Sequence, residues 1–188
     1  MRSVKMGSPM SLALKKVKKM NRFWNEASLK EELTHLTIII DSREQRNEHI
    51  RAFFDKNNIP YVVRKLDSGD YSAMLGDMTL EHDVFLERKN SLTELCGNMG
   101  QNRDRFNNEF TRAKAIGAKP FLLIENNTTD DVFLGNYRSQ FNAKSLWASI
   151  CTWMVRYNTT VLFCDKRNSG RIIYSVLYYY AREALVYE

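Results

Sequence analysis

The sequence has 188 residues, of which 44% are hydrophobic and only three are proline, a composition that suits one globular domain with a sizeable core and argues against disorder. No stretch approaches the roughly 18 consecutive apolar residues of a membrane-spanning helix, so we expect no membrane partner. The cysteines Cys96, Cys151 and Cys164 are odd in number and lack CxxC spacing, which argues against a disulfide framework and a cysteine-based zinc site. We therefore expect a cytoplasmic, reducing environment.

The net charge of +6 is located in the N-terminal part of the chain. Residues 1–30 hold eight basic residues and one acid, Glu26, whereas residues 31–188 hold 20 basic and 21 acidic residues. We predict a basic N-terminal arm over residues 1–35 and a folded domain over residues 36–188. The arm residues that would contact nucleic-acid phosphates are Lys15, Lys16, Lys18 and Lys19, although a short lysine run is equally typical of a solvated tail.

The first half of the domain predicts several strands and one helix. The β-branched run at 36–40 is typical of a buried strand, and residues 47–59 carry apolar side chains at helical spacing. Further strands are expected at 61–66, 71–75, 76–80 and 83–89. The Gly76–Asp77 pair between the second and third of these predicts a hairpin.

The second half predicts alternating helices and strands. Residues 91–116 have a helical pattern that Gly97 and Gly100 weaken, so one long helix and two shorter helices both remain open. The remaining elements are a strand at 120–126, a helix at 143–157, a strand at 160–165 and an amphipathic helix from 169 onwards. This order of elements predicts an α/β fold with a mixed β-sheet flanked by helices.

Three charged clusters sit at the ends of predicted strands: residues 41–44, Gly69–Asp70 and residues 87–89. In proteins Mg²⁺ takes one or two carboxylates and keeps several waters, and Asp70 and Glu87 can supply such a pair. Lys89 would then lie beside a metal-bound water, where it can orient that water, help to deprotonate it or offset charge on a phosphate. Taken singly, each cluster also has an ordinary structural explanation as a turn, a helix cap or a surface ion pair.

The order of charges in the third cluster has a direct geometric consequence. Side chains alternate between the two faces of a strand, so Glu87 and Lys89 share one face. Arg88 is predicted to point to the opposite face. If Arg88 acts at the same site, the strand has to end or twist at that residue.

Four segments together resemble the nuclease domain of the XPF-type structure-specific endonucleases, within the PD-(D/E)xK superfamily. The segments are "IIIDSRE" (38–44), "SGDY" (68–71), "FLERKNSLTEL" (85–95) and "FLLIEN" (121–126). The family signature is GD, a variable gap, ERK, three residues and an acid, and the resemblance covers roughly residues 36–165. It implies a restriction-endonuclease-like form of the predicted fold.

The resemblance also implies a function and a set of site residues. By position, Asp70, Glu87 and Asp41 would bind Mg²⁺ or Mn²⁺, and Lys89, Arg43 and Arg88 would be the cationic residues of the active site, with Asp70, Glu87 and Lys89 as the catalytic core. The implied activity is metal-dependent hydrolysis of phosphodiester bonds in branched or structured DNA during repair or recombination, leaving 5′-phosphate and 3′-hydroxyl ends.

One position departs from the family pattern. Thr93 stands four residues after Lys89, where the family usually has an acid. Glu94 is adjacent, but one step along a helix turns a side chain by about 100°, so it is not a clean substitute. Two alternatives therefore stay open: a non-catalytic DNA-binding or partner-scaffolding module on the same fold, and another metal-dependent phosphotransferase or RNA nuclease.

The partners are expected to include DNA and a second copy of the chain. Arg103, Arg105 and Arg112 on the 91–116 stretch are candidates for binding DNA, with a solvated helix face as the alternative. The strongly apolar final helix could cover the sheet or form a homodimer interface. The closest analogy is a compact, stand-alone nuclease of phages and prophages, which would act in the host cytoplasm or at the nucleoid.

Overall fold

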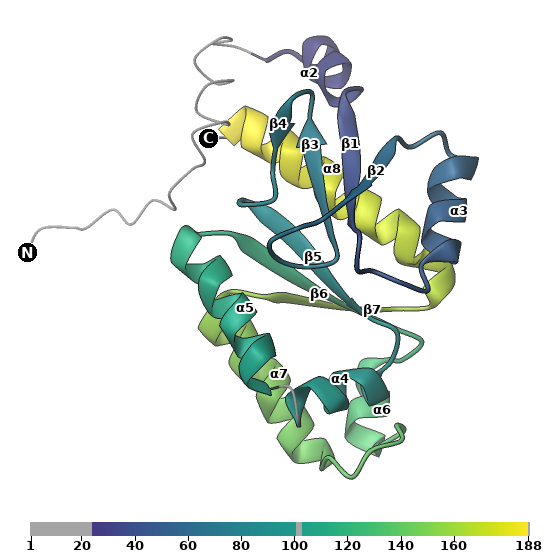
Figure 1. Cartoon of the computed structure of the whole chain (residues 1–188), viewed down its shortest axis with the longest axis vertical. Coiled ribbons are helices and arrows are strands. Elements are labelled where there is room, and N and C mark those ends of the chain that lie inside the picture. The colour runs from purple at the N-terminus through teal and green to yellow at the C-terminus, as the bar shows by residue number, and fades with distance from the viewer. Residues whose placement is uncertain (1–23, 101–102, 188) are drawn as a thin grey trace, which may run out of the picture.

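The computed structural model describes residues 24–100 and 103–187, which form one mixed β-sheet with helices packed around it (Figure 1). The strands are β1 (Leu36–Asp41), β2 (Tyr61–Arg64), β3 (Tyr71–Leu75), β4 (Met78–Thr79), β5 (Val84–Lys89), β6 (Lys119–Glu125) and β7 (Thr160–Cys164). The helices are α2 (Glu26–Leu33), α3 (Glu48–Lys56), α4 (Leu92–Met99), α5 (Arg103–Ile116), α6 (Thr129–Leu134), α7 (Ala143–Tyr157) and α8 (Ser169–Tyr187), with a 3₁₀ turn η1 (Lys166–Asn168).

The sheet has the strand order β2-β1-β3-β5-β6-β7, and β4 pairs with β3. Strands β1 and β2 are parallel, as are β5, β6 and β7, whereas β3 runs antiparallel to both of its neighbours β1 and β5. The predicted hairpin is present as β3–β4, in which Met74 is opposite Thr79. The prediction of an α/β fold with a mixed, helix-flanked sheet is confirmed.

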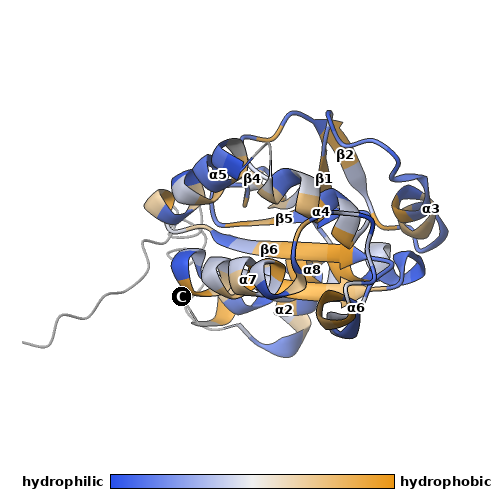
Figure 2. Ribbon diagram, turned by 90° about the horizontal axis from the view of Figure 1, so that it is seen from below, coloured by the Kyte–Doolittle hydropathy of each residue, from blue (hydrophilic) through white to orange (hydrophobic). Residues whose placement is uncertain are grey.

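Alternation along β6 shows how the sheet divides two hydrophobic cores. Leu123 belongs to the core that includes Leu177 of α8, whereas Leu122 belongs to the core that includes Phe110 of α5 and Trp153 of α7. Neighbouring residues face opposite sides of a strand, so a continuous apolar run is needed where helices cover both faces. Figure 2 accordingly shows hydrophobic central strands and helices with hydrophilic residues on their outer surfaces.

The helical stretch at 91–116 forms two helices, α4 and α5. Helix α6 was not predicted, because its six residues are too few for a periodic pattern; it is defined instead by its ends. Thr128 forms a capping box with Asp131 at the N-terminus, and Gly135, with φ of 70°, ends the helix in the left-handed region.

Helix α2 lies within the segment 1–35 that was predicted as an arm. Its Leu29 and Leu33 are buried in the same core as β1 and α8, so residues from Trp24 onwards pack with the sheet. The four arm lysines lie outside the described residues. In the described part of the chain, no helix is both long and apolar enough to cross a membrane.

Candidate active site

Strands β1, β3 and β5 bring their charged ends to one edge of the sheet. Because β3 is antiparallel to both neighbours, its first residue, Tyr71, lies opposite Ile40 near the end of β1 and opposite Leu86, three residues before the end of β5. Asp70, which precedes β3, accepts a backbone hydrogen bond from Asp41 N and donates one to Leu86 O, both at 2.8 Å. The expected convergence of the charged clusters therefore follows from the strand directions.

The turn before Asp70 depends on a glycine. Gly69 has a φ of +72°, and a Cβ at this position would lie 2.4 Å from the Phe85 ring and 2.9 Å from Leu86 O. Glycine alone combines this backbone conformation with such a close approach at low cost. The turn is thereby packed directly onto β5, the strand that carries Glu87.

A cavity of about 610 Å³ opens at this edge of the sheet. It is lined by five carboxylates and three cationic side chains: Asp41, Asp67, Asp70, Glu87, Glu109, Arg43, Lys89 and Arg112. Five of the six predicted active-site residues are in this set; Arg88 is not. A cavity that gathers both signs of charge suits a substrate that carries negative charge and is bound with a cation.

Glu87 and Lys89 form a buried pair on the cavity face of β5. Lys89 Nζ donates to Glu87 Oε1 at 2.6 Å and lies 5.3 Å from the centre of the Phe106 ring. Burial alone would lower the pKa of Lys89, but the negative charges of Glu87 and Asp70 raise it above its usual value. Lys89 is therefore a cation at neutral pH, suited to orienting a water or stabilising a phosphate.

Asp70 and Glu87 are carboxylates in an unfavourable electrostatic setting. The pKa of Asp70 is raised well above its usual value by burial and by the charge of Glu87, and the pKa of Glu87 is raised by burial despite its ion pair with Lys89. A divalent cation between them would relieve this cost, so the two side chains fit a Mg²⁺ or Mn²⁺ site completed by waters. Among residues 24–100 and 103–187, no cluster of three or more His, Cys, Asp or Glu side chains is arranged to hold a metal ion.

Asp41, predicted as a third metal ligand, has both carboxylate oxygens engaged by the protein. Its Oδ1 accepts from Arg43 N and Nε at 2.7 and 2.8 Å, and its Oδ2 accepts from Arg43 Nη2 at 2.9 Å and Leu66 N at 2.7 Å. Burial raises the pKa of Asp41, but these hydrogen bonds outweigh burial and leave it below its usual value. The arrangement fits an anchor that holds the guanidinium of Arg43 at the cavity.

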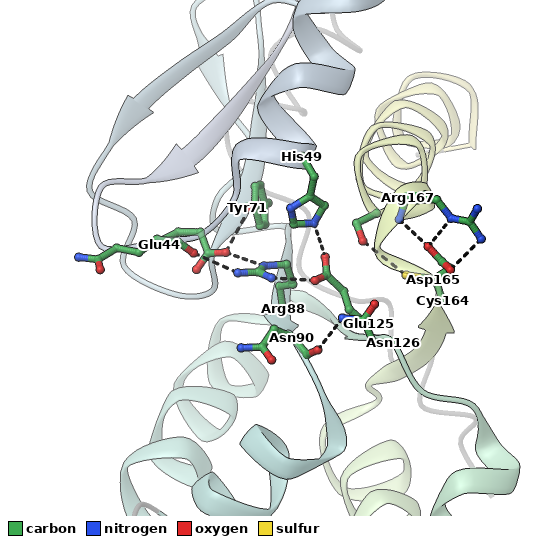
Figure 3. A network of polar contacts seen from close by, with 12 residues as sticks. Glu44, His49, Tyr71, Arg88, Asn90, Glu125, Asn126, Cys164, Asp165 and Arg167 are labelled. Carbon is green, nitrogen blue, oxygen red and sulfur yellow. Dashed lines mark hydrogen bonds and ion pairs between the residues drawn. The ribbon is translucent and has the colours of Figure 1, made fainter. Parts of the chain in front are cut away.

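Arg88 points to the other face of β5, as alternation predicted, and lies in a buried network (Figure 3). Its guanidinium donates to Glu44 Oε1 at 2.6 Å, Glu125 Oε2 at 2.9 Å and Gln45 O at 3.1 Å. Burial disfavours the charged guanidinium, yet the two carboxylates raise the pKa of Arg88 further above its usual value. With its donors engaged and its side chain 5% exposed, Arg88 is placed to hold strands together rather than to contact a substrate phosphate.

Two more side chains complete this network. Tyr71 Oη donates to Glu44 Oε1 at 3.2 Å, and His49 Nε2 lies 2.9 Å from Glu125 Oε1 (Figure 3). Three of the motif segments therefore contribute to both sides of the sheet, with some residues in the cavity and others in the network: "IIIDSRE", "SGDY" and "FLERKN". The fourth segment, "FLLIEN", supplies Glu125 to the network.

The structure places Glu94, and not residue 93, beside Lys89. Thr93 is exposed, and its Oγ1 accepts a hydrogen bond from Arg138 N at 3.0 Å. Glu94 Oε2 accepts from Asn90 N at 3.0 Å, while Oε1 lies 3.8 Å from Lys89 Nζ. Glu94 thus folds back toward the end of β5 from the first turn of α4 and reaches ion-pair distance from Lys89, although it stands one residue after the position at which the family usually has an acid.

The predicted DNA-binding arginines of α5 lie in different settings. Arg112 lines the active-site cavity, whereas Arg103 lines a separate groove of about 550 Å³ beside α7. Arg105 lies on α5 between them in sequence. The helix therefore contributes to the cavity with only part of its basic side chains.

Sequence reasoning missed two contributions of α5 to the site. Glu109 Oε1 accepts a hydrogen bond from Gly69 N at 2.6 Å, and Phe106 lies under the Lys89 ammonium group. The only signal in the sequence is their spacing, since Phe106, Glu109 and Arg112 recur every three residues and fall on one helix face. The proximity of α5 to the Gly69–Asp70 turn depends on the contact between Glu109 and Gly69, which are 40 residues apart in the sequence, and a local pattern does not reveal such a contact.

Comparisons with known proteins agree with this architecture. The profile of the ERCC4 domain matches residues 40–176, while no curated protein matches the chain. Among solved structures, XPF from Aeropyrum pernix aligns with a TM-score of 0.60 and 18% identity, and its complex with DNA with a TM-score of 0.58 and 17% identity.

Both alignments cover 78% of this chain and 65% of the other, so the chain spans less than two thirds of the length of that protein. At this identity the structural likeness establishes the fold alone. Family membership rests on the ERCC4 match, which spans most of the chain, including three of the motif segments and residues 40–44 of the first. The chain belongs to the ERCC4 domain family.

Proposed function

We propose that this chain is a metal-dependent DNA endonuclease that hydrolyses phosphodiester bonds in branched or otherwise structured DNA. The observation that carries the proposal is the meeting of Asp70, Glu87 and Lys89 in one charged cavity. Membership of the ERCC4 domain family supports the class of activity. DNA as the substrate is supported by the similar protein from Aeropyrum pernix, which is known in complex with DNA.

In the proposed mechanism, Asp70 and Glu87 would hold Mg²⁺ or Mn²⁺ through their carboxylate oxygens. When bound, such an ion lowers the pKa of a coordinated water and offsets negative charge on the scissile phosphate. Lys89, held as a cation by Glu87, orients the attacking water and stabilises the charge that develops on the phosphate. Arg43 and Arg112 line the cavity and bind phosphate oxygens of the strand, for which a guanidinium has suitable planar geometry.

Arg88 has a different part in this mechanism. Its side chain joins β5 to Glu44 and Glu125, while its backbone N–H donates to Asp70 Oδ2 at 2.7 Å. We assign it the role of holding the Asp70 carboxylate in place. It therefore acts through Asp70 rather than on the DNA.

The finer features of the proposal concern substrate and assembly. The products would carry 5′-phosphate and 3′-hydroxyl ends, and the flanking DNA would contact Arg103, Arg105 and the four N-terminal lysines. The apolar face of the final helix α8 is buried against the sheet, so a homodimer would form through its outer side, where Tyr179 is exposed.

The test is cleavage of end-labelled single-stranded, duplex, flap and fork DNA, and of matching RNA, with Mg²⁺, Mn²⁺ or EDTA. Wild type should cut at least one DNA structure only with the metal, and Glu87→Gln should lower the rate at least about a hundredfold. Glu48→Gln, an exposed change of the same type on α3, is the matched control and should cut as wild type. Binding of these DNAs by wild type without cleavage would overturn the proposal in favour of a non-catalytic DNA-binding module.

A further inference from the structure

Helix α5 forms a wall of the active-site cavity through one of its faces. Phe106, Glu109 and Arg112 are spaced three residues apart and all line the cavity. Phe106 is buried under the Lys89 ammonium group, whereas Arg112 is exposed. Glu109 lies between them in sequence and is half-buried, so its carboxylate is aimed at the interior of the site.

The Glu109 carboxylate has a specific partner there. Its Oε1 accepts the backbone N–H of Gly69 at 2.6 Å, a short, charge-assisted hydrogen bond. Gly69 is buried, and the packing of its Cα against Phe85 and Leu86 O leaves the peptide little freedom to turn. This donor would otherwise face the cavity without a protein acceptor, because β3 starts only at Tyr71.

Gly69 directly precedes Asp70, so a restraint on its peptide is also a restraint on Asp70. The other ties of Asp70 come from the sheet: Asp41 N to its carbonyl, its own N–H to Leu86 O, and Arg88 N to its carboxylate. All of these hydrogen bonds connect Asp70 to strands β1 and β5. The hydrogen bond from Gly69 to Glu109 instead connects the turn to helix α5, on the other side of the cavity.

We propose that Glu109 is a positioning residue, which fixes the turn before Asp70 through its hydrogen bond to Gly69 and so sets the Asp70 carboxylate for metal binding. The proposal rests on the nuclease function proposed above. Glu109 acts as a hydrogen-bond acceptor in this role, and its negative charge is not required. A glutamine, which keeps an acceptor oxygen at the same distance along the side chain, should therefore replace it in large part.

The experiment compares Glu109→Gln with Glu109→Ala in the full chain. Asp104→Ala, which removes a negative charge from an exposed position of the same helix, is the control. Three quantities are measured: amide hydrogen exchange of Gly69 by NMR, affinity for Mn²⁺ without DNA, and the single-turnover cleavage rate at saturating DNA. DNA affinity is measured separately with Ca²⁺ in place of Mg²⁺.

Glu109→Ala should raise Gly69 exchange and lower the cleavage rate by about tenfold or more each, the size expected for loss of a charge-assisted hydrogen bond. Its Mn²⁺ affinity should fall by about tenfold, while DNA affinity changes less than about threefold. Glu109→Gln should keep Gly69 protected and lose no more than about threefold in rate and Mn²⁺ affinity. Asp104→Ala should match wild type in all measurements.

Two results would overturn the proposal. Equal losses of rate in Glu109→Gln and Glu109→Ala would show that the negative charge, not the hydrogen bond, is used. Unchanged Gly69 exchange in Glu109→Ala would show that the contact does not hold the turn. If wild type cuts no DNA, the nuclease proposal fails separately. The role of Glu109 is then decided by the amide exchange of Gly69 and the carboxyl ¹³C shift of Asp70. Both must change in Glu109→Ala and stay near wild type in Glu109→Gln.

Discussion

Arg88 and Asp70 are joined through the backbone: the Arg88 N–H donates to Asp70 Oδ2 at 2.7 Å, while the Arg88 side chain lies on the opposite face of β5. One residue thus connects the charged cavity with the buried network. Any shift of β5 caused by loss of the network would move the donor that holds Asp70. The stability of the sheet edge and the geometry of the proposed active site are therefore coupled.

Replacing Arg88 should destabilise the protein strongly. Arg88→Ala would leave Glu44 and Glu125, whose side chains are 11% and 1% exposed, without their shared cation. Removing one partner of a buried ion pair costs about 3–5 kcal/mol, and urea denaturation at pH 7 should show a loss of that size. Cleavage, measured where the variant is still folded, should fall with little change in DNA affinity.

A surface arginine provides the control for Arg88. Arg167 binds Asp165 through two hydrogen bonds of 2.9 Å, but its side chain is 84% exposed. Exposed ion pairs contribute little because water and salt screen them, so Arg167→Ala should leave the unfolding transition unchanged. Similar losses of unfolding free energy in Arg88→Ala and Arg167→Ala would show that burial does not make the Arg88 ion pairs more stabilising than an exposed ion pair.

Asp70→Asn should stabilise the protein at neutral pH while abolishing cleavage. The asparagine keeps the shape and an acceptor for Arg88 N–H but removes a charge that burial and Glu87 make costly. The gain in unfolding free energy at pH 7 without metal should be on the order of 1–2 kcal/mol. Adding Mg²⁺ should stabilise wild type and have little effect on the variant.

The same residue predicts a pH dependence with a definite sign. The folded-state pKa of Asp70 lies above the ordinary value of about 4, so the folded protein binds this proton more tightly than the unfolded chain. The stability from this proton is present below about pH 4 and is lost as the pH rises through the raised pKa. Denaturation of wild type and Asp70→Asn across that range should show the gap between them widening with pH; a constant gap would contradict the assignment.

Gly69→Ala should be far more damaging than the same change at Gly76. Both glycines have positive φ, +72° and +56°, but a Cβ on Gly69 would collide with Phe85, whereas none of the atoms lies within 4 Å of a Cβ on Gly76. We expect losses of about 2–4 kcal/mol for Gly69→Ala and about 1 kcal/mol for Gly76→Ala, measured by urea denaturation. Equal losses would mean that φ alone, and not packing on β5, sets the cost.

Glu94 and Thr93 should differ in their effect on cleavage. Glu94 Oε1 lies 3.8 Å from Lys89 Nζ, and its side chain is 40% exposed, so Glu94→Gln should lower the single-turnover rate by about twofold to fivefold. Thr93→Ala should change it less, because Thr93 contacts Arg138 N instead. A gain of rate in Thr93→Asp would contradict this view, since position 93 does not face Lys89.

The faces of β5 on which the charged residues 87–89 lie could be predicted from the sequence, because they depend only on the alternation of neighbouring side chains along the strand. A period of two residues places Glu87 and Lys89 on one face of β5 and Arg88 on the other, and the structure shows this arrangement. The strand predicted at 120–126 is likewise present as β6, and its long apolar run fits the burial of both its faces. Helix α6 was missed, because six residues carry too little periodicity.

By itself, the sequence determined the mixed sheet, the order of its main elements and the faces on which the motif charges lie, because these follow from composition and short-range periodicity. Only the tertiary structure decided which charges meet. Arg88 pairs with Glu44 and Glu125 across 44 and 37 residues, and Glu109 reaches Gly69 across 40. Such contacts arise from the antiparallel course of β3 and the packing of α5, and no local pattern encodes which of several nearby carboxylates a cation or a peptide N–H will take.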